Sequence, residues 1–151
     1  MNIRRVLSST LAAGLLLAGS SLAGAQTPAV TVHDAWVREP MGGRNVTGAF
    51  AIVENSGATP RSIVSATSDV SDKVELHEMK NEGGMMKMSM VQKLEIPAKG
   101  KLELKPGSFH VMLFDVKTKL AEGGKVTLTL KLDDGSTVTT EAQVRKAGMM
   151  Q

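Results

Sequence analysis

Lys125–Leu132, with the sequence KVTLTLKL, alternates polar and apolar residues without interruption and decides the fold class. Side chains of a β-strand point alternately to opposite faces of the sheet. The apolar residues Val126, Leu128, Leu130 and Leu132 therefore share one face, which we expect to face a core. Asp133-Asp134-Gly135 follows directly, and an Asp-Gly pair between two strand-like runs predicts a hairpin turn. We expect the chain to return as a second strand over Ser136–Lys146.

The rest of the chain shows the same pattern in shorter pieces. Strand-like runs cover Val30–Val37, Val46–Asn55, Arg61–Thr67, Lys73–Lys80, Met85–Gln92, Leu94–Ile96, Lys101–Leu104 and Phe109–Val116. Turn residues recur about every 8–12 positions, and Thr118–Gly124 is the one place where a helical turn is expected. About eight or nine short strands with such spacing predict an all-β protein, an antiparallel β-sandwich or barrel.

The first residues predict export from the cytoplasm. Arg4 and Arg5 precede an apolar run over Leu11–Ala18, and Ala23-Gly24-Ala25 fits a signal-peptidase cleavage site. We therefore expect residues 1–25 to be a signal peptide and residues 26–151 to form a single exported domain. The apolar run is too short to span a membrane, and no cysteine follows the cleavage site to carry a lipid.

Composition excludes several classes of function. The chain of 151 residues has no cysteine, which excludes disulfides and thiolate metal sites. Its formal net charge is +3, of which the expected signal peptide contributes +2. Without a basic run, and with few aromatic residues, it is not expected to bind nucleic acid. We find no nucleophile–base set and no paired carboxylates, so we do not expect an enzyme. We also expect the protein to be a monomer.

Soft metal donors are concentrated between Lys73 and Val116. Two of the three histidines and six of the ten methionines lie there. Imidazole and thioether are soft, neutral donors, and such donors select Cu(I) over hard cations. His110 and Met112 share one face of their expected strand. The apolar residues of that strand occupy its other face, where we expect the core.

The first half of this region predicts a hairpin that carries further donors. If Asn81–Gly84 is a four-residue loop, Lys80 pairs with Met85 and His77 stands directly opposite Met88. A slip of one residue would turn Met88 to the opposite face. Three more methionines share this face: Met79, Met86 and Met90. They can serve as relay or alternative copper ligands, or can be solvent-facing filler, and hairpin methionines in general can be core filler.

These spacings resemble the periplasmic copper chaperone family called PCuAC. The signature of that family is His, ten residues, Met, twenty-one residues, then His-x-Met. The residues at those spacings here are His77, Met88, His110 and Met112. Asp34–Arg38 and Gly48–Phe50 also look like early segments of the family, so the resemblance extends across the mature chain.

The resemblance implies a cupredoxin-like, Greek-key β-sandwich that binds one Cu(I) per chain through these four residues. It also implies copper delivery toward the binuclear CuA centre on subunit II of cytochrome c oxidase, with other periplasmic copper carriers as partners. His33 lies outside the signature, and we expect it to be an ordinary strand residue. The C-terminal Met149-Met150 lacks the histidines that accompany Met-rich tails in some relatives.

The sequence leaves two alternatives to a copper chaperone to consider. A redox cupredoxin of the blue-copper type needs a cysteine ligand, and this chain has none. The second alternative is an exported β-sandwich that binds or assembles with partners through the Met-rich hairpin. A copper titration of the mature protein separates that alternative from a chaperone.

Overall fold

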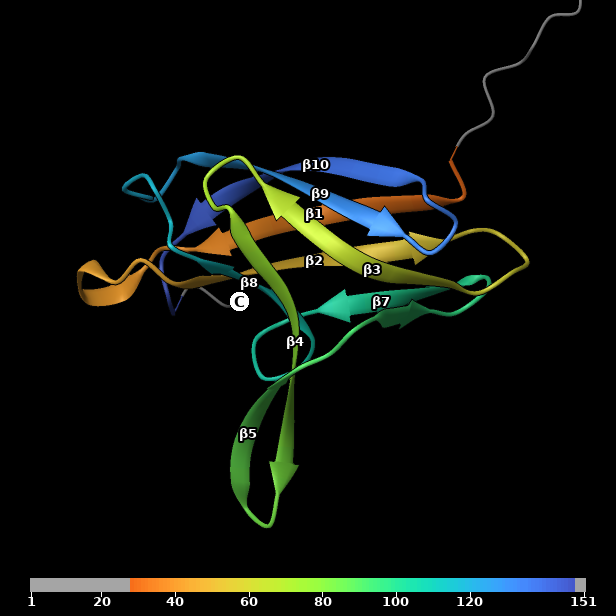
Figure 1. The fold of residues 1–151 in the computed structure, drawn as a ribbon, viewed down its shortest axis with the longest axis horizontal. Coiled ribbons are helices and arrows are strands. Elements are labelled where there is room, and N and C mark those ends of the chain that lie inside the picture. The colour runs from red at the N-terminus through yellow and green to blue at the C-terminus, as the bar shows by residue number, and fades with distance from the viewer. Residues whose placement is uncertain (1–27, 149–151) are drawn as a thin grey trace, which may run out of the picture.

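The computed structural model describes residues 28–148, which form ten β-strands and one short 3-10 turn (Figure 1). The strands are β1 (Val30–Arg38), β2 (Thr47–Asn55), β3 (Arg61–Ser68), β4 (Lys73–Glu82), β5 (Met85–Met90), β6 (Leu94–Ile96), β7 (Gly100–Leu104), β8 (His110–Phe114), β9 (Lys125–Leu132) and β10 (Thr137–Arg145). The 3-10 turn, η1, covers Met41–Gly43. The expected signal peptide, residues 1–25, and Met149-Met150 lie outside the described residues.

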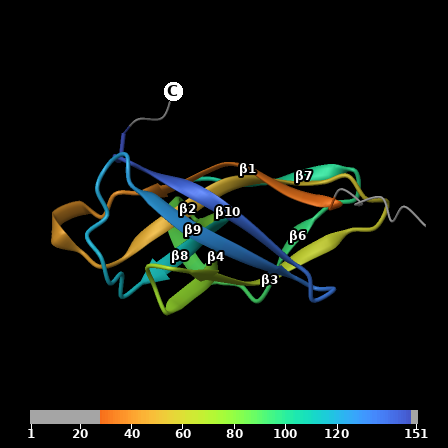
Figure 2. The ribbon, with the colours of Figure 1, turned by 90° about the horizontal axis from the view of Figure 1, so that it is seen from above.

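The strands belong to one hydrogen-bonded sheet that folds over on itself. Its order is β5-β4-β8-β2-β1-β10-β9-β3-β6, and β7 pairs with the part of β2 that β8 leaves free. Seen from above, β3 and β4 lie on one side of the molecule and β1 and β7 on the other (Figure 2). The predicted all-β fold class is confirmed. One feature is new: β1 and β10 run parallel, whereas the other pairs are antiparallel.

Strand β9 has the predicted bounds and orientation. Its apolar residues Val126, Leu128, Leu130 and Leu132 are at most 3% exposed. The hairpin at Asp133–Gly135 is also confirmed, because the Leu132 N–H donates to the Ser136 carbonyl oxygen at 2.8 Å. Gly135 has a φ of 84°, a conformation that glycine adopts without steric cost. Apolar alternation and turn chemistry together therefore determine this half of the core.

The expected helical turn over Thr118–Gly124 is wrong. The segment is irregular, with a turn at Glu122-Gly123. The Gly123 N–H donates to the Val144 carbonyl oxygen at 3.0 Å and ties the segment to β10, while the Gly124 N–H closes a single turn onto the Ala121 carbonyl oxygen at 2.9 Å.

The expected four-residue loop of the β4–β5 hairpin is wrong as well. The ladder continues to Glu82 and Met85, which leaves Gly83-Gly84 as a two-residue turn. Both glycines have positive φ, 62° and 86°, as the favoured two-residue hairpin turns require. Asn81 supports the turn from within the strand, because its side-chain oxygen accepts the Gly84 N–H at 2.9 Å.

The tighter turn shifts the strand register by two residues. His77 pairs with Met90, and Met79 pairs with Met88, in place of the expected pairing of His77 with Met88. Because side chains alternate with a period of two, this shift leaves Met88 on the same face as His77. The hairpin projects from the body of the molecule (Figure 1), since β4 pairs with β8 only as far as His77.

Candidate metal site

Neighbouring strands bring the two predicted histidines together. His77 of β4 stands directly opposite His110 of β8, and their ring centroids are 5.9 Å apart. Met112 shares the face of His110 and lies opposite Glu75. His110 is 3% exposed and His77 9% exposed. The face that carries the donors is therefore covered too, whereas the sequence indicated only the opposite face of β8 as core.

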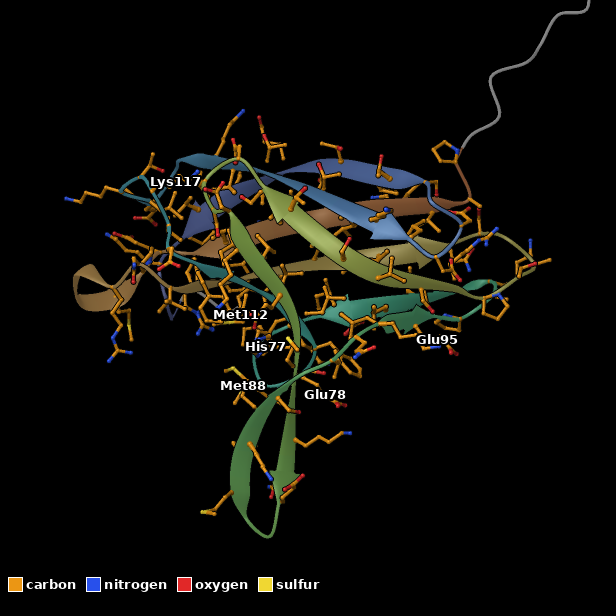
Figure 3. The ribbon with its side chains drawn as sticks, viewed as in Figure 1. His77, Glu78, Met88, Glu95, Met112 and Lys117 are labelled. Atoms are coloured by element: carbon orange, nitrogen blue, oxygen red, sulfur yellow. The ribbon has the colours of Figure 1, made fainter. Side chains whose placement is uncertain are left out.

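A cavity of about 260 Å³ opens at the base of the hairpin. Three of the four predicted ligands line it: Met88, His110 and Met112. Figure 3 shows Met88 and Met112 close to His77, at the point where the hairpin leaves the body. His77 itself does not line the cavity. Met88 is 46% exposed, so this donor remains accessible from solvent. The arrangement places soft donors from β4, β5 and β8 in one region.

One ring nitrogen of His110 is held by a backbone carbonyl. Its Nδ1 lies 2.9 Å from the Ser108 carbonyl oxygen. A carbonyl oxygen only accepts hydrogen bonds, so Nδ1 carries a proton, and in the neutral tautomer the lone pair is on Nε2. Burial lowers the pKa of His110, and the charges of His77 and Arg38 lower this pKa further. The hydrogen bond to Ser108 acts in the opposite direction and raises it. A neutral imidazole is the form that binds metal ions.

His77 is oriented by a carboxylate. Its Nε2 donates to Glu75 Oε2 at 2.8 Å, while its Nδ1 is buried without a hydrogen-bond partner among the described residues. The hydrogen bond from His77 holds the pKa of Glu75 below its usual value, and the charge of Lys73 contributes further. A buried ring nitrogen without a partner costs folding free energy. It is also an atom suited to a metal, since metal-binding histidines commonly donate their other nitrogen to a carboxylate.

The two imidazoles form part of a continuous row of rings. The ring centroids of Trp36 and Phe50 are 4.4 Å apart, and Phe50 lies 6.2 Å from His110. On the other side, His77 lies 6.0 Å from Phe114. Ring contacts of this kind restrict the imidazoles and exclude water from one side of the site.

Gly48 allows this row to form. A Cβ atom at Gly48 would lie 3.0 Å from the tip of the Phe50 ring, closer than side-chain carbons normally approach. Gly48 also pairs with Met112 in the β2–β8 ladder. The packing of Phe50 over its own strand gives a physical reason for glycine two residues before it.

The remaining donors lie around the site or away from it. Met86 and Met90 share the face of Met88 and are exposed, and Met85 faces the other side of the hairpin at 75% exposure. Met86 and Met90 thus face solvent, whereas Met79 is partly buried. His33 lies in β1, hydrogen-bonds Thr31 at 3.1 Å, and is outside the cavity lining.

Two methionines that the His/Met signature leaves out line the cavity, Met41 and Met79. The face of Met79 was predictable from strand alternation, and its place beside Met88 follows from the register. Met41 had no such signal, because it lies in a loop without periodicity. Gly42 and Gly43, with φ of 64° and 71°, bend that loop back at η1.

Hard-ligand alternatives are absent from the described part of the chain. No group of three or more His, Asp or Glu side chains that could hold a metal ion occurs in residues 28–148. In the same residues, no helix is both long and apolar enough to span a bilayer. The imidazole–thioether cluster is therefore the metal-site candidate.

Comparison with known proteins gives matches over most of the chain. Residues 30–144 match the family model described as "Putative lipoprotein LpqE-like". A protein of Leifsonia xyli subsp. xyli, described as "Putative lipoprotein Lxx21020", is 34% identical over 152 residues, which cover 93% of this chain and 90% of that protein.

Solved structures share the fold. The solution structure of CuI-DR1885 from Deinococcus radiodurans is 36% identical, covers 83% of this chain and 85% of its own, and superposes with a TM-score of 0.67. The apo PCuAC domain from PmoF1 superposes with a TM-score of 0.68 over 81% of this chain and 98% of its own. Its sequence identity is 23%, so this likeness shows the fold.

Proposed function

The chain belongs to the LpqE-like family, and we propose that it is a copper chaperone that binds one Cu(I). We assign the ligands to His77, Met88, His110 and Met112. The observation that carries this proposal is the cavity in which Met88, His110 and Met112 meet, beside the paired His77. The Cu(I) form of DR1885, at 36% identity, supports copper as the cargo.

The chemistry of the donor set suits Cu(I). Among residues 28–148, no hydrogen bond is formed by His110 Nε2 or His77 Nδ1, and both side chains are buried. Met88 and Met112 add two thioethers, so all four donors are neutral and soft, as Cu(I) prefers. Thioethers bind less tightly than thiolates would, and the exposed Met88 can be replaced by a ligand from an acceptor. Such a site suits a carrier that releases its cargo rather than an enzyme.

We further propose that the chaperone acts as a monomer in the periplasm and delivers copper toward the CuA centre on subunit II of cytochrome c oxidase. Support comes from the signal-peptide pattern of residues 1–25 and from the resemblance to PCuAC. The sequence contains no cysteine to which a lipid could be attached by a thioether bond.

Removing one sulfur at a time tests the ligand assignment. Met88→Leu and Met112→Leu keep side-chain volume, and Leu/Met exchanges cost less than about 1.5 kcal/mol in folding free energy. Loss of even an outer partner costs metal sites about 10- to 100-fold in affinity, so we expect each variant to lose at least that much Cu(I) affinity. Competition with a chromophoric Cu(I) chelator measures this. The matched control is Met85→Leu, on the other face of β5, and an equal loss there would contradict the assignment.

Copper handover tests delivery separately. The Cu(I)-loaded protein is mixed with the apo CuA domain of subunit II, and native mass spectrometry counts copper on each protein. We expect copper to move to the CuA domain. If this domain takes up free Cu(I) but none from the loaded protein, delivery to CuA is wrong while copper binding stands.

A second candidate function is favoured by the exposure of the hairpin. Strand β5 lies at the end of the sheet order and carries exposed methionines, which suits a surface that binds a partner protein. In that case the protein would bind Cu(I) no more tightly than a variant lacking both His77 and His110. The competition assay therefore separates the two functions.

A further inference from the structure

We propose that Met41, Met79 and Met88 form a second, weaker Cu(I) site at the mouth of the cavity, through which copper enters and leaves the His/Met site. This inference rests on the proposed function. Met41 and Met79 line the same cavity as Met88, His110 and Met112, yet neither belongs to the four proposed ligands.

Met79 and Met88 are held as a pair by the strand register. They stand directly opposite each other in the β4–β5 ladder. Opposed residues on one face have Cβ atoms about 4.5–5.5 Å apart, a separation that two flexible thioether side chains can close around one ion. The two-residue turn at Gly83-Gly84 sets this pairing; the four-residue loop would have placed Met88 opposite His77.

Met41 approaches from a separate element. It begins η1, whose backbone is closed by a hydrogen bond from the Arg44 N–H to the Met41 carbonyl oxygen at 3.3 Å. The Met41 side chain is largely exposed and still lines the cavity. Three thioethers from η1, β4 and β5 thus line one cavity, and a set of three neutral sulfurs suits Cu(I).

The donor set makes this second site weaker than the first. The first site has two imidazoles and two thioethers, whereas the second has three thioethers and no imidazole. Arg38 and Arg44 both line the cavity, with Glu39 as the one acidic residue of the lining. Two positive charges against one negative charge oppose a cation bound anywhere in the cavity, and the charge of Arg38 acts on His110 as well. We therefore expect the three thioethers to hold copper less tightly than the His/Met site does.

Met88 links the two sites. It belongs to the proposed ligand set, and it pairs with Met79 at the mouth. Copper can therefore move inward by exchanging the sulfurs of Met41 and Met79 for the donors of His110 and Met112 while Met88 stays bound. Each step replaces one neutral ligand with another, and copper remains Cu(I) throughout.

Methionine methyl NMR of the wild-type protein tests this, with Ag(I) as a redox-inert substitute for Cu(I). The first equivalent should shift the methyl resonances of Met88 and Met112. Further Ag(I) should shift those of Met41 and Met79 and leave Met85 unchanged. If Met41 and Met79 respond no more than Met85, the second site is wrong. If Met88 and Met112 do not respond to the first equivalent, the proposed function fails instead.

Variants provide a second measurement. In the His77→Ala/His110→Ala protein we expect residual Ag(I) binding, which Met41→Leu or Met79→Leu should weaken at least about tenfold, the lower bound for loss of an outer metal partner. Met85→Leu in the same background is the matched control. Residual binding that does not depend on Met41 and Met79 would overturn the proposal. If the double variant does not fold, the wild-type NMR titration decides alone.

Discussion

The two imidazoles of the proposed site have different hydrogen-bond partners. His77 donates to the carboxylate of Glu75, and His110 donates to the backbone carbonyl of Ser108. A carboxylate partner raises the basicity of a metal-binding imidazole more than a neutral carbonyl does, because it is charged. A substitution at Glu75 can therefore remove the negative charge beside His77 while keeping the hydrogen bond that orients the His77 ring.

Glu75→Gln should lower Cu(I) affinity by about 10- to 100-fold, the usual effect of losing an outer-shell carboxylate. The amide still accepts the His77 proton but carries no charge. The chelator competition assay measures the affinity, and circular dichroism checks the fold. Glu103→Gln is the matched control, since Glu103 lies in β7 and pairs with Lys101 and Lys105 outside the cavity. If Glu75→Gln leaves the Cu(I) affinity unchanged, the charge of Glu75 does not contribute to copper binding.

The β4–β5 hairpin is the element that places Met88. Gly83 has a φ of 62°, which a β-branched residue adopts only with strain, whereas asparagine tolerates it. Gly83→Val should disturb the register and lower Cu(I) affinity, with little change in the melting temperature of the body, from which the hairpin projects (Figure 1). Gly83→Asn should bind copper like the wild type.

Equal affinities for Gly83→Val and Gly83→Asn would show that the turn does not set the site. Hydrogen exchange of the β5 amides distinguishes a displaced hairpin from a general loss of structure.

The β9–β10 turn makes a pH-dependent contribution to stability. Asp134 accepts hydrogen bonds from the Ser136 hydroxyl and the Ser136 N–H, which together with Arg61 hold the pKa of Asp134 below its usual value. A lowered folded-state pKa means that the unfolded chain binds more protons in acid. The stabilisation is thus present above the ordinary pKa of about 3.9 and is lost as the pH falls through the folded-state pKa.

Asp134→Ala should therefore lower the melting temperature at pH 7, and the difference from the wild type should shrink below about pH 4. Thermal unfolding followed by circular dichroism between pH 2 and pH 7 measures it. A difference independent of pH would mean that the carboxylate acts only as a neutral cap.

Element by element, the sequence predicted what depends on alternation and missed what depends on local backbone geometry. Strand β9 could be placed correctly because apolar and polar residues alternate strictly. The expected loop at Asn81–Gly84 is two residues too long, because its composition fits either length and does not show that the ladder continues to Glu82 and Met85. The face of Met88 was still correct, since both lengths have the same parity.

At the scale of the whole molecule, the candidate site depends on a strand order that spacing alone cannot give. β5, β4 and β8 are neighbours in the sheet although the chain between β5 and β8 passes through β6 and β7. The sequence indicated which residues are donors, but not that His110 is buried between Phe50 and His77. Burial and the ring row depend on residues from β1 and β2 that pack only in the folded protein.

The central claim is that one Cu(I) is bound by imidazole nitrogen and thioether sulfur. X-ray absorption at the copper K-edge of the one-to-one Cu(I) complex tests this most directly, because nitrogen and sulfur scatterers are distinguished by their distance from copper. We expect both nitrogen and sulfur ligands in the wild type, and loss of the sulfur contribution in Met88→Leu/Met112→Leu. A wild-type spectrum with only nitrogen or oxygen ligands, or one that this double substitution leaves unchanged, would contradict the account.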